Sequence, residues 1–334
     1  MSEDRVLLAH GDGGELMAEL IERVFVSRLG TGEPPGDDSA RLRGGERLVF
    51  TTDAFVVDPI FFPGGDIGKL AVCGTVNDLA AAGARPLALS ASFILEEGLP
   101  IADLERIVDS MAAASAEAGV KVLCGDTKVV PRGRADRVYV STSGVGEVPS
   151  GIEVSGGNAQ PGAVVLVSGP VGDHGLAVLS RREGLAFESP IESDCAPLGA
   201  LVQALLAAAP GVRVLRDPTR GGLATALNEI AQQSGVEIEI EEAAVPVRSS
   251  VSAACELLGL DPLYAANEGK MIVVVPAEQT QAALSALQAN ALGRLAAVIG
   301  RVAAGERPRV LLRTALGTRR ILDRHVGEQM PRIC

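Results

Sequence analysis

The stretch FFPGGDIGKLAVCGTVNDLAAAGA, residues 61–84, carries the features around which the chain is organised. A glycine turn ends at Asp66, a residue type that caps helices, so we expect a helix over 66–82. Asp78 lies in the apolar part of this stretch. A buried carboxylate must be paired or coordinate a metal. The stretch therefore predicts a helix that carries a functional carboxylate, although an ion pair with a basic side chain would also explain Asp78.

Strands and helices alternate on both sides of this helix, which predicts a mixed α/β (α+β) fold in two domains. Residues 143–162 are rich in Gly, Ser and Pro, as linkers are. In the first half we expect helices at 66–82 and 101–118 and strands at 47–53, 86–95, 120–124 and 137–146. In the second half we expect a loop at 168–175, helices at 198–208 and 223–233, and strands at 163–167, 212–216, 236–242, 271–275 and 296–302.

Length and composition exclude several classes of protein. The chain has 334 residues, of which 47% are hydrophobic, enough for two ordinary domains and too apolar for a disordered chain. Its apolar runs are shorter than the ~20 residues of a spanning helix, and no signal segment follows the N-terminus. The net charge of −12 argues against a nucleic-acid partner. Five cysteines without a CxxC pair favour a reduced compartment, so we expect a cytoplasmic protein with no membrane contact.

Acidic residues recur at turns and strand ends. Asp37 and Asp38 follow a Pro-Gly turn, Asp53 ends a predicted strand, and Asp126 follows another. Each of them alone could be an ordinary cap or turn residue. Together with Asp78 they could hold Mg²⁺, which prefers oxygen ligands and bridges to phosphates. An acidic protein that handles phosphates needs such cations.

The usual nucleotide-binding and hydrolase motifs are missing. The sequence has no P-loop, no GxGxxG after a strand, no GxSxG and no HExxH. One segment does suit an anion, because DPTRGGL (217–223) joins a strand end, a Gly221-Gly222 turn and a helix N-terminus. Such a turn presents backbone N–H groups to phosphate. A purely structural turn explains the segment equally well.

The C-terminus ends in Pro-Arg-Ile-Cys, a basic segment on an acidic body. A terminal thiol on a flexible arm can carry a covalent group between sites. An incidental cysteine on a frayed chain end is the alternative interpretation.

Taken together, these motifs resemble the HypE family of hydrogenase expression/formation proteins, within the PurM-like (aminoimidazole-ribonucleotide-synthetase) superfamily. The resemblance runs from residue 10 to the end. VNDLA, GDT and GGL belong to the wider superfamily, whereas the terminal PRIC points to HypE itself. The motifs that carry the resemblance are FFPGGDIGK (61–69), VNDLA (76–80), GDTKVV (125–130), GDHG (172–175), DPTRGGL (217–223), NEGK (267–270) and PRIC (331–334).

The resemblance implies an ATP- and Mg²⁺-dependent carbamoyl dehydratase that makes the cyanide ligands of [NiFe]-hydrogenase. A partner, HypF, would place a carbamoyl group on Cys334, the chain would dehydrate it to a thiocyanate, and the HypC–HypD complex would receive the cyano group. We expect catalytic roles for Cys334, Glu268 as base and Lys128, and a homodimer. The implied ATP-binding residues are Lys69, Asp66, Thr127, Asn77, Gly221 and Gly222, and the implied metal ligands are Asp37, Asp38, Asp53, Asp78 and Asp126.

The implied fold is a two-domain PurM-like fold with a flexible C-terminal tail. We expect an N-terminal arm at 1–42, an ATP- and Mg-binding domain at 43–150, a second domain at 151–310, and the tail at 311–334. Two alternatives remain open at this point. The chain could be another ATP-dependent PurM-like enzyme, or a non-enzymatic carrier that uses Cys334 only to transport a group.

Overall fold

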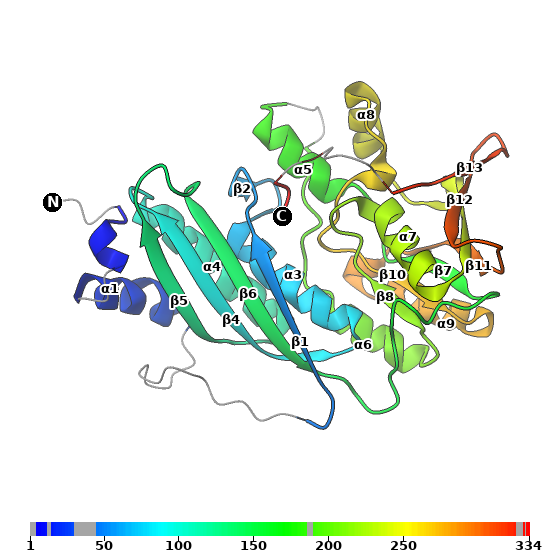
Figure 1. Ribbon diagram of the computed structural model, residues 1–334, viewed down its shortest axis with the longest axis horizontal. Helices are drawn as coiled ribbons and strands as arrows, with labels where there is room; N and C mark the ends of the chain where they lie inside the picture. Colours follow the sequence, from blue (N-terminus) through cyan, green and yellow to red (C-terminus); the bar gives the residue numbers. More distant parts are fainter. Residues whose placement is uncertain (1–4, 12–14, 30–44, 186–189, 325–329, 331) are drawn as a thin grey trace.

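The computed structural model describes residues 5–11, 15–29, 45–185, 190–324, 330 and 332–334. Asp37 and Asp38, two of the expected metal ligands, lie outside the described residues. The described elements form two α/β units side by side, each built on one large sheet (Figure 1). The predicted mixed α/β, PurM-like fold class is confirmed.

The first unit is a four-stranded sheet with helices on one face. Across the sheet the strands are β1 (Leu48–Phe55), β6 (Val138–Glu147), β4 (Arg85–Glu96) and β5 (Val122–Val130). Only β4 and β5 run parallel. Helices α3 (Ile67–Ala81) and α4 (Ile101–Ala118) lie behind the sheet in Figure 1. Its front face exposes Phe50 and Ile94, so among the described residues no element covers that face.

The second unit is a seven-stranded sheet between two helical layers. Its strand order is β13 (Arg319–Ile321), β12 (Arg309–Arg313), β9 (Glu237–Glu241), β11 (Ala297–Ala303), β7 (Val164–Val167), β10 (Ile272–Val275) and β8 (Val214–Arg216). Successive strand side chains point to opposite faces. Val274 therefore packs in the core under α7 (Gly222–Ser234), and Val273 in the core under α6 (Gly199–Ala208) and α9 (Thr280–Ala289).

Shorter elements complete the described chain. They are α1 (Glu15–Leu20), α2 (Ser27–Leu29), the hairpin strands β2 (Phe61–Phe62) and β3 (Gly65–Asp66), α5 (Asp173–Arg182) and α8 (Ser249–Leu258). An ion pair of 2.6 Å between Arg28 and Asp109 holds the end of α2 against α4. None of the helices described is both long and apolar enough to cross a bilayer.

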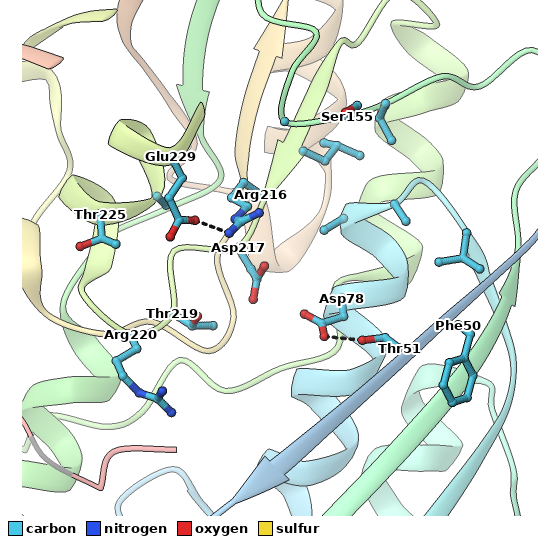
Figure 2. Close-up of a pocket in the computed structure, with 17 residues that line it drawn as sticks. Phe50, Thr51, Asp78, Ser155, Arg216, Asp217, Thr219, Arg220, Thr225 and Glu229 are labelled. Carbon is cyan, nitrogen blue, oxygen red and sulfur yellow. Dashed lines mark hydrogen bonds and ion pairs between the residues drawn. The ribbon is translucent and has the colours of Figure 1, made fainter. Parts of the chain in front are cut away.

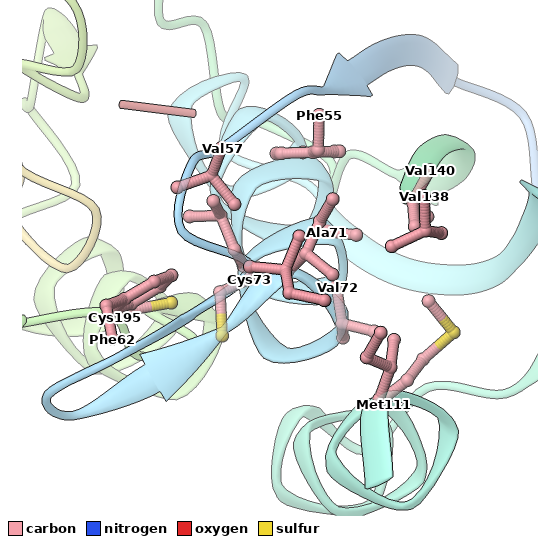
Figure 3. Packing of buried hydrophobic residues seen from close by; sticks show 14 of the residues in the cluster. Phe55, Val57, Phe62, Ala71, Val72, Cys73, Met111, Val138, Val140 and Cys195 are labelled. Carbon is pink, nitrogen blue, oxygen red and sulfur yellow. The ribbon is translucent and has the colours of Figure 1, made fainter. Parts of the chain in front are cut away.

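Helix α3 is the central element of the fold. The Asp66 carboxylate caps it by accepting from the N–H groups of Gly68 and Lys69 at 2.8 and 3.2 Å, as expected. The helix is buried along nearly its whole length, in a cluster that includes Cys73, Phe55 and Met111 (Figure 3). It contacts both the first sheet and α6 of the second unit. Because its residues are apolar on nearly all sides, α3 can pack against both units and connects them.

Three expectations about local structure are wrong. Strand β5 runs on to Val130, because parallel pairing with β4 continues past the predicted end, so Asp126 lies inside the strand. Helix α5 starts at Asp173, inside the segment expected to be a loop. The expected tail at 311–334 starts within β12, because Val310 and Leu312 are buried in the second core and β12 pairs with β9 and β13. The segment up to Ile321 is thus part of the sheet.

The close approach of α3 and α4 depends on a glycine. A Cβ at Gly68 would lie 2.1 Å from the backbone oxygen of Ile107. Gly68→Ala should therefore lower the free energy of unfolding by about 1–3 kcal/mol, despite the helix propensity of alanine. Gly199→Ala is the matched control, since its nearest neighbour would be Val76 at 4.0 Å. Equal urea midpoints for the two variants would contradict this account of the helix packing.

Candidate functional site

A pocket of about 510 Å³ opens between the two units (Figure 2). One wall comes from β1 and α3, and the other from β8, the loop after β8 and α7. Its polar side chains are mostly charged. The lining residues labelled in Figure 2 are Phe50, Thr51, Asp78, Ser155, Arg216, Asp217, Thr219, Arg220, Thr225 and Glu229.

Three carboxylates influence one another here: Asp78 and Asp217 on the pocket walls, and Asp53 nearby on β1. Burial, helped by the nearby Asp217 and Asp53, raises the pKa of Asp78 from 3.8 to about 6, although a 2.8 Å hydrogen bond from Thr51 opposes the shift. Burial also raises the pKa of Asp217 and of Asp53, and the charge of Asp53 adds to the effect on Asp217. Like charges held together in this way favour a cation between them.

The pocket carboxylates suit Mg²⁺ in one respect. Within the described ranges, no three or more His, Cys, Asp or Glu side chains are grouped to hold a metal by themselves. Mg²⁺ does not need such a group, because it usually takes one or two carboxylates plus phosphate oxygens and waters. Asp78 and Asp217, on facing walls, provide that donor set (Figure 2).

The glycine turn lies at the N-terminus of α7, beside the pocket. Gly221 and Gly222 have φ of 79° and 61°, the left-handed region that glycine adopts without strain. A Cβ on Gly222 would also lie 2.6 Å from the carbonyl oxygen of Ala265. The turn therefore requires glycine for backbone reasons, and it also points the N-terminus of a 13-residue helix at the pocket side, which favours anions.

The end of the chain is docked in the protein. We use "docked C-terminus" for residues 330 and 332–334. Backbone N–H groups of Asp58 and Val56 donate to the carbonyls of Arg332 (3.1 Å) and Cys334 (3.3 Å). Arg182 also donates to the Arg332 carbonyl at 2.7 Å. These hydrogen bonds set which residues of the docked C-terminus face Val56 and Asp58, and so they fix the position of Cys334.

The buried His174 contacts the docked C-terminus at Ile333, between the hydrogen-bonded residues Arg332 and Cys334. Nε2 of His174 lies 3.0 Å from the Ile333 carbonyl oxygen, and Nδ1 lies 2.8 Å from Ser193 Oγ. A carbonyl can only accept, so Nε2 carries the proton and Nδ1 accepts from Ser193. Burial lowers the pKa of His174, so the neutral ring is favoured. Met330 packs nearby against Gly175.

The docked C-terminus brings the Cys334 thiol to a charged site. Arg220 Nη2 lies 3.1 Å from its sulfur. Burial, together with the charge of Glu268, raises the pKa of the Cys334 thiol to about 11, while Arg220 opposes the rise. The thiol is therefore protonated at neutral pH when docked.

Glu268 is a buried carboxylate with an unpaired oxygen. Its side chain is 3% exposed, and Oε1 finds no hydrogen-bond partner among the described residues. Burial, with the nearby charge of Asp217, raises its pKa well above 4.5. Its backbone is held on both sides, because Asp194 accepts from its N–H at 3.1 Å and Asn77 donates to its carbonyl at 3.0 Å. A carboxylate kept in this state is a strong base once ionised.

The surroundings of Glu268 are a buried polar network. Asp194 forms a 2.9 Å ion pair with Lys270, both nearly fully buried. The Asn77 amide also donates to the Ala196 carbonyl and accepts from the Leu198 N–H. Asn77, expected to bind ATP, is thus committed to joining α3 to the chain around Glu268.

Two expected site residues, Lys128 and Asp126, lie on β5, away from the pocket. Lys128 and Asp126 form a 2.8 Å ion pair on the exposed side of β5, and this bond lowers the pKa of Asp126. Strands β1 and β5 are opposite edges of the first sheet, so this pair is separated from Asp53 on β1. The neighbouring Thr127 is buried on the other face.

Lys69 and Asp66 serve the turn before α3. Nζ of Lys69 donates to the Gly64 carbonyl at 3.0 Å, and Asp66 caps the helix. The structure therefore brings together Cys334, Glu268, Asp53 and Asp78 of the expected set, near the glycine turn. A role of Lys69 or Asp66 in binding ATP stays a prediction.

Sequence reasoning did not single out Arg220, which contacts the thiol, or Asp217, which lines the pocket. Both stand inside the motif DPTRGGL, whose glycines carried the prediction of anion binding. An acidic and a basic residue next to an anion-binding turn were the sequence signal that could have indicated these roles. His174 stands in GDHG, one of the motifs of the resemblance, and no role was predicted for it. Asp194 lies in no motif, so only the fold could reveal it.

Comparison with protein families identifies both units. The AIR synthase related protein N-terminal domain matches residues 36–148, and the corresponding C-terminal domain matches residues 160–313.

Individual relatives match over the whole length. The carbamoyl dehydratase HypE of Rhodobacter capsulatus is 55% identical, covering 100% of this chain and 99% of the relative. A crystal structure of the hydrogenase maturation protein HypE in complex with ATP is 50% identical with a TM-score of 0.93, covering 98% of this chain and 99% of that one. HypE in a HypE–HypF complex is 48% identical with a TM-score of 0.82, covering 93% and 100%.

The raised pKa of Asp78 predicts a cost in stability. The pKa of Asp78 is about 6 in the folded state and 3.8 in the unfolded chain. Asp78 therefore costs no stability below pH 3.8, where it is protonated in both states, and it lowers the free energy of unfolding increasingly as pH rises to 6. Asp78→Asn removes this loss and should raise the free energy of unfolding by about 3 kcal/mol above pH 6. The gain should shrink below pH 6 and vanish near pH 4.

Urea unfolding at several pH values tests this, with Asp109→Asn as control. Asp109 is an exposed partner of Arg28, so its replacement should change stability by less than ~1 kcal/mol at any pH. A destabilised Asp78→Asn at pH 7 would instead identify Asp78 as a structural ion-pair partner.

Proposed function

The chain belongs to the HypE family and is an ATP-dependent carbamoyl dehydratase of hydrogenase maturation, and we propose that Cys334 carries the group it dehydrates. On this proposal an S-carbamoyl group on Cys334 becomes a thiocyanate, the source of the cyanide ligands of the [NiFe]-hydrogenase iron. The observation that carries it is the docked Cys334 thiol within electrostatic reach of Glu268, whose carboxylate has an unpaired, buried oxygen.

The chemistry needs a phosphoryl donor and a base. Hydroxide is a poor leaving group, so the carbamoyl oxygen attacks the γ-phosphorus of ATP, a new P–O bond forms, and ADP leaves. One N–H proton is lost as the C=N bond forms. The second is lost as the C–O bond breaks and phosphate departs, which leaves S–C≡N. Overall, ATP and S-carbamoyl give ADP, phosphate and thiocyanate, with both nitrogen protons removed.

Glu268 suits the proton transfer. Its carboxylate is near enough to the docked thiol for its charge to raise the pKa of Cys334, and burial makes it more basic than an exposed glutamate. The Asn77 and Asp194 bonds to its backbone keep it in place. Enclosure by the docked C-terminus would also exclude water from the reacting group.

The pocket between the two units suits the triphosphate of ATP. The N-terminus of α7 and its glycine turn favour phosphate, and Asp78 and Asp217 would hold Mg²⁺ against it. When bound, Mg²⁺ offsets the charge of the phosphates. Asp53, near both, would complete the acidic set.

A homodimer would give Asp126 and Lys128 a role. The uncovered face of the first sheet exposes apolar side chains, including Phe50 and Ile94, and suits a second copy of this chain. Because β1 and β5 are the two edges of that sheet, a two-fold arrangement can bring β5 of one copy to β1 and the pocket of the other. We expect Lys128 to stabilise the transferring group in that way.

The remaining partners act before and after dehydration. HypF would load the carbamoyl group onto Cys334, which requires the docked C-terminus to leave its site. The HypC–HypD complex would then receive the cyano group. A carrier without enzymatic activity would not need its thiol beside an unpaired carboxylate, which argues for the enzyme.

Two variants separate loading from dehydration. Cys334→Ala should bind ATP but accept no carbamoyl group. Glu268→Gln should be carbamoylated normally and stop there, because the base is lost. Mass spectrometry of the C-terminal peptide after HypF, carbamoyl phosphate and ATP distinguishes the states, since dehydration removes one water. Thiocyanate formed by Glu268→Gln at the wild-type rate would exclude Glu268 as the base.

Mixing two inactive variants tests the shared site. If Lys128 acts across the dimer, a mixed dimer of Lys128→Ala and Glu268→Gln contains one site with both residues intact. Random pairing should then restore about a quarter of wild-type activity. Mixing Glu268→Gln with Cys334→Ala is the control for a pair within one chain, and it should restore none. Failure of the first mixture to recover activity would contradict the role of Lys128 across the interface.

A further inference from the structure

We propose, on the basis of the function above, that Arg220 is a catalytic residue that stabilises the oxygen of the Cys334-bound carbamoyl group during phosphoryl transfer. Arg220 precedes the glycine turn of α7 and lines the pocket (Figure 2). Its Nη2 lies 3.1 Å from the Cys334 sulfur. One side chain therefore reaches both the acceptor and the space assigned to the phosphoryl donor.

The guanidinium of Arg220 is uncommitted. In the described part of the chain no carboxylate lies within 4.0 Å of it, whereas Arg216 is paired with Glu229 and Lys270 with Asp194. Glu268 and Asp53 are close enough to influence it without forming ion pairs. Among the cations that the structure describes near the thiol, Arg220 is thus the one without a carboxylate partner and is available to a reacting group.

The position of the carbamoyl oxygen suits a hydrogen bond from the Arg220 guanidinium. Its oxygen is two bonds from the sulfur that Arg220 already contacts, and guanidinium has several N–H groups in one plane. In the transfer the bond from γ-phosphorus to the β–γ bridging oxygen breaks and a bond to the carbamoyl oxygen forms. Negative charge is spread over the transferring oxygens, where a fixed cation is most effective. Glu268 removes protons from the nitrogen on the same group.

A single-turnover assay tests this role. Carbamoylated chains are mixed with saturating ATP, and thiocyanate is followed by the mass of the C-terminal peptide. Arg220→Met should be carbamoylated and bind ATP but dehydrate about 10³-fold more slowly. Arg220→Lys keeps the positive charge but lacks the planar set of N–H donors, so its dehydration rate should lie between those of Arg220→Met and the wild type. Arg313→Met, which removes a surface arginine paired with Glu241, should match the wild type.

Thiol reactivity separates catalysis from docking. Arg220 opposes the rise in the pKa of the docked thiol, so its loss should slow alkylation of uncarbamoylated Cys334 by iodoacetamide. If Arg220 only held the docked C-terminus, the released thiol would be alkylated faster. Faster alkylation, or thiocyanate formation within a few-fold of the wild type, would overturn the assignment. A wild-type chain that forms no thiocyanate would instead overturn the proposed function.

Discussion

Burial of the Glu268 carboxylate without a partner for one oxygen is the constraint on which the site depends. Such a group is unfavourable in a protein interior unless its surroundings hold it. The surroundings here are rigid: Asp194 and Asn77 bond its backbone, and Lys270 balances the charge of Asp194. Because Asn77 is on α3, the same helix that joins the two units fixes Glu268, the proposed base, relative to the pocket carboxylate Asp78.

The docked C-terminus completes this site from the far end of the chain. Among the described residues other than glycine, Arg332 is one of two with positive φ, at 52°, a conformation that persists only where contacts impose it. Those contacts include the 3.1 Å bond from Asp58 to its carbonyl and the ion pair of its guanidinium with Asp136. On the proposed function, loading of Cys334 by a separate protein requires all of these contacts to break, so docking has to be both specific and reversible. Individually modest hydrogen bonds suit this need.

Sequence reasoning identified the fold, and it predicted several residues that the structure places in the candidate site. Periodicity and capping placed α3 and most strands, because Asp66 and the apolar helix are local signals. Glu268 and Cys334 came from motifs whose chemistry the family implies. The position of Lys128 relative to Cys334 depends on strand order, which local patterns do not encode. The strand pairing after residue 309 was missed for a similar reason: β12 is held by β9, some 70 residues away in sequence.

On the proposed function, dehydration takes place while the last three residues stay in their docked register. The most direct test of this is the single-turnover rate of a carbamoylated chain with one glycine inserted between Ile333 and Cys334. The sulfur then leaves its place beside Glu268 and Arg220, so no thiocyanate should form. A glycine inserted between Asp323 and Arg324 lengthens the chain before the docked residues and should leave the rate near that of the wild type. Thiocyanate formed at the wild-type rate by the first insertion would contradict the claim.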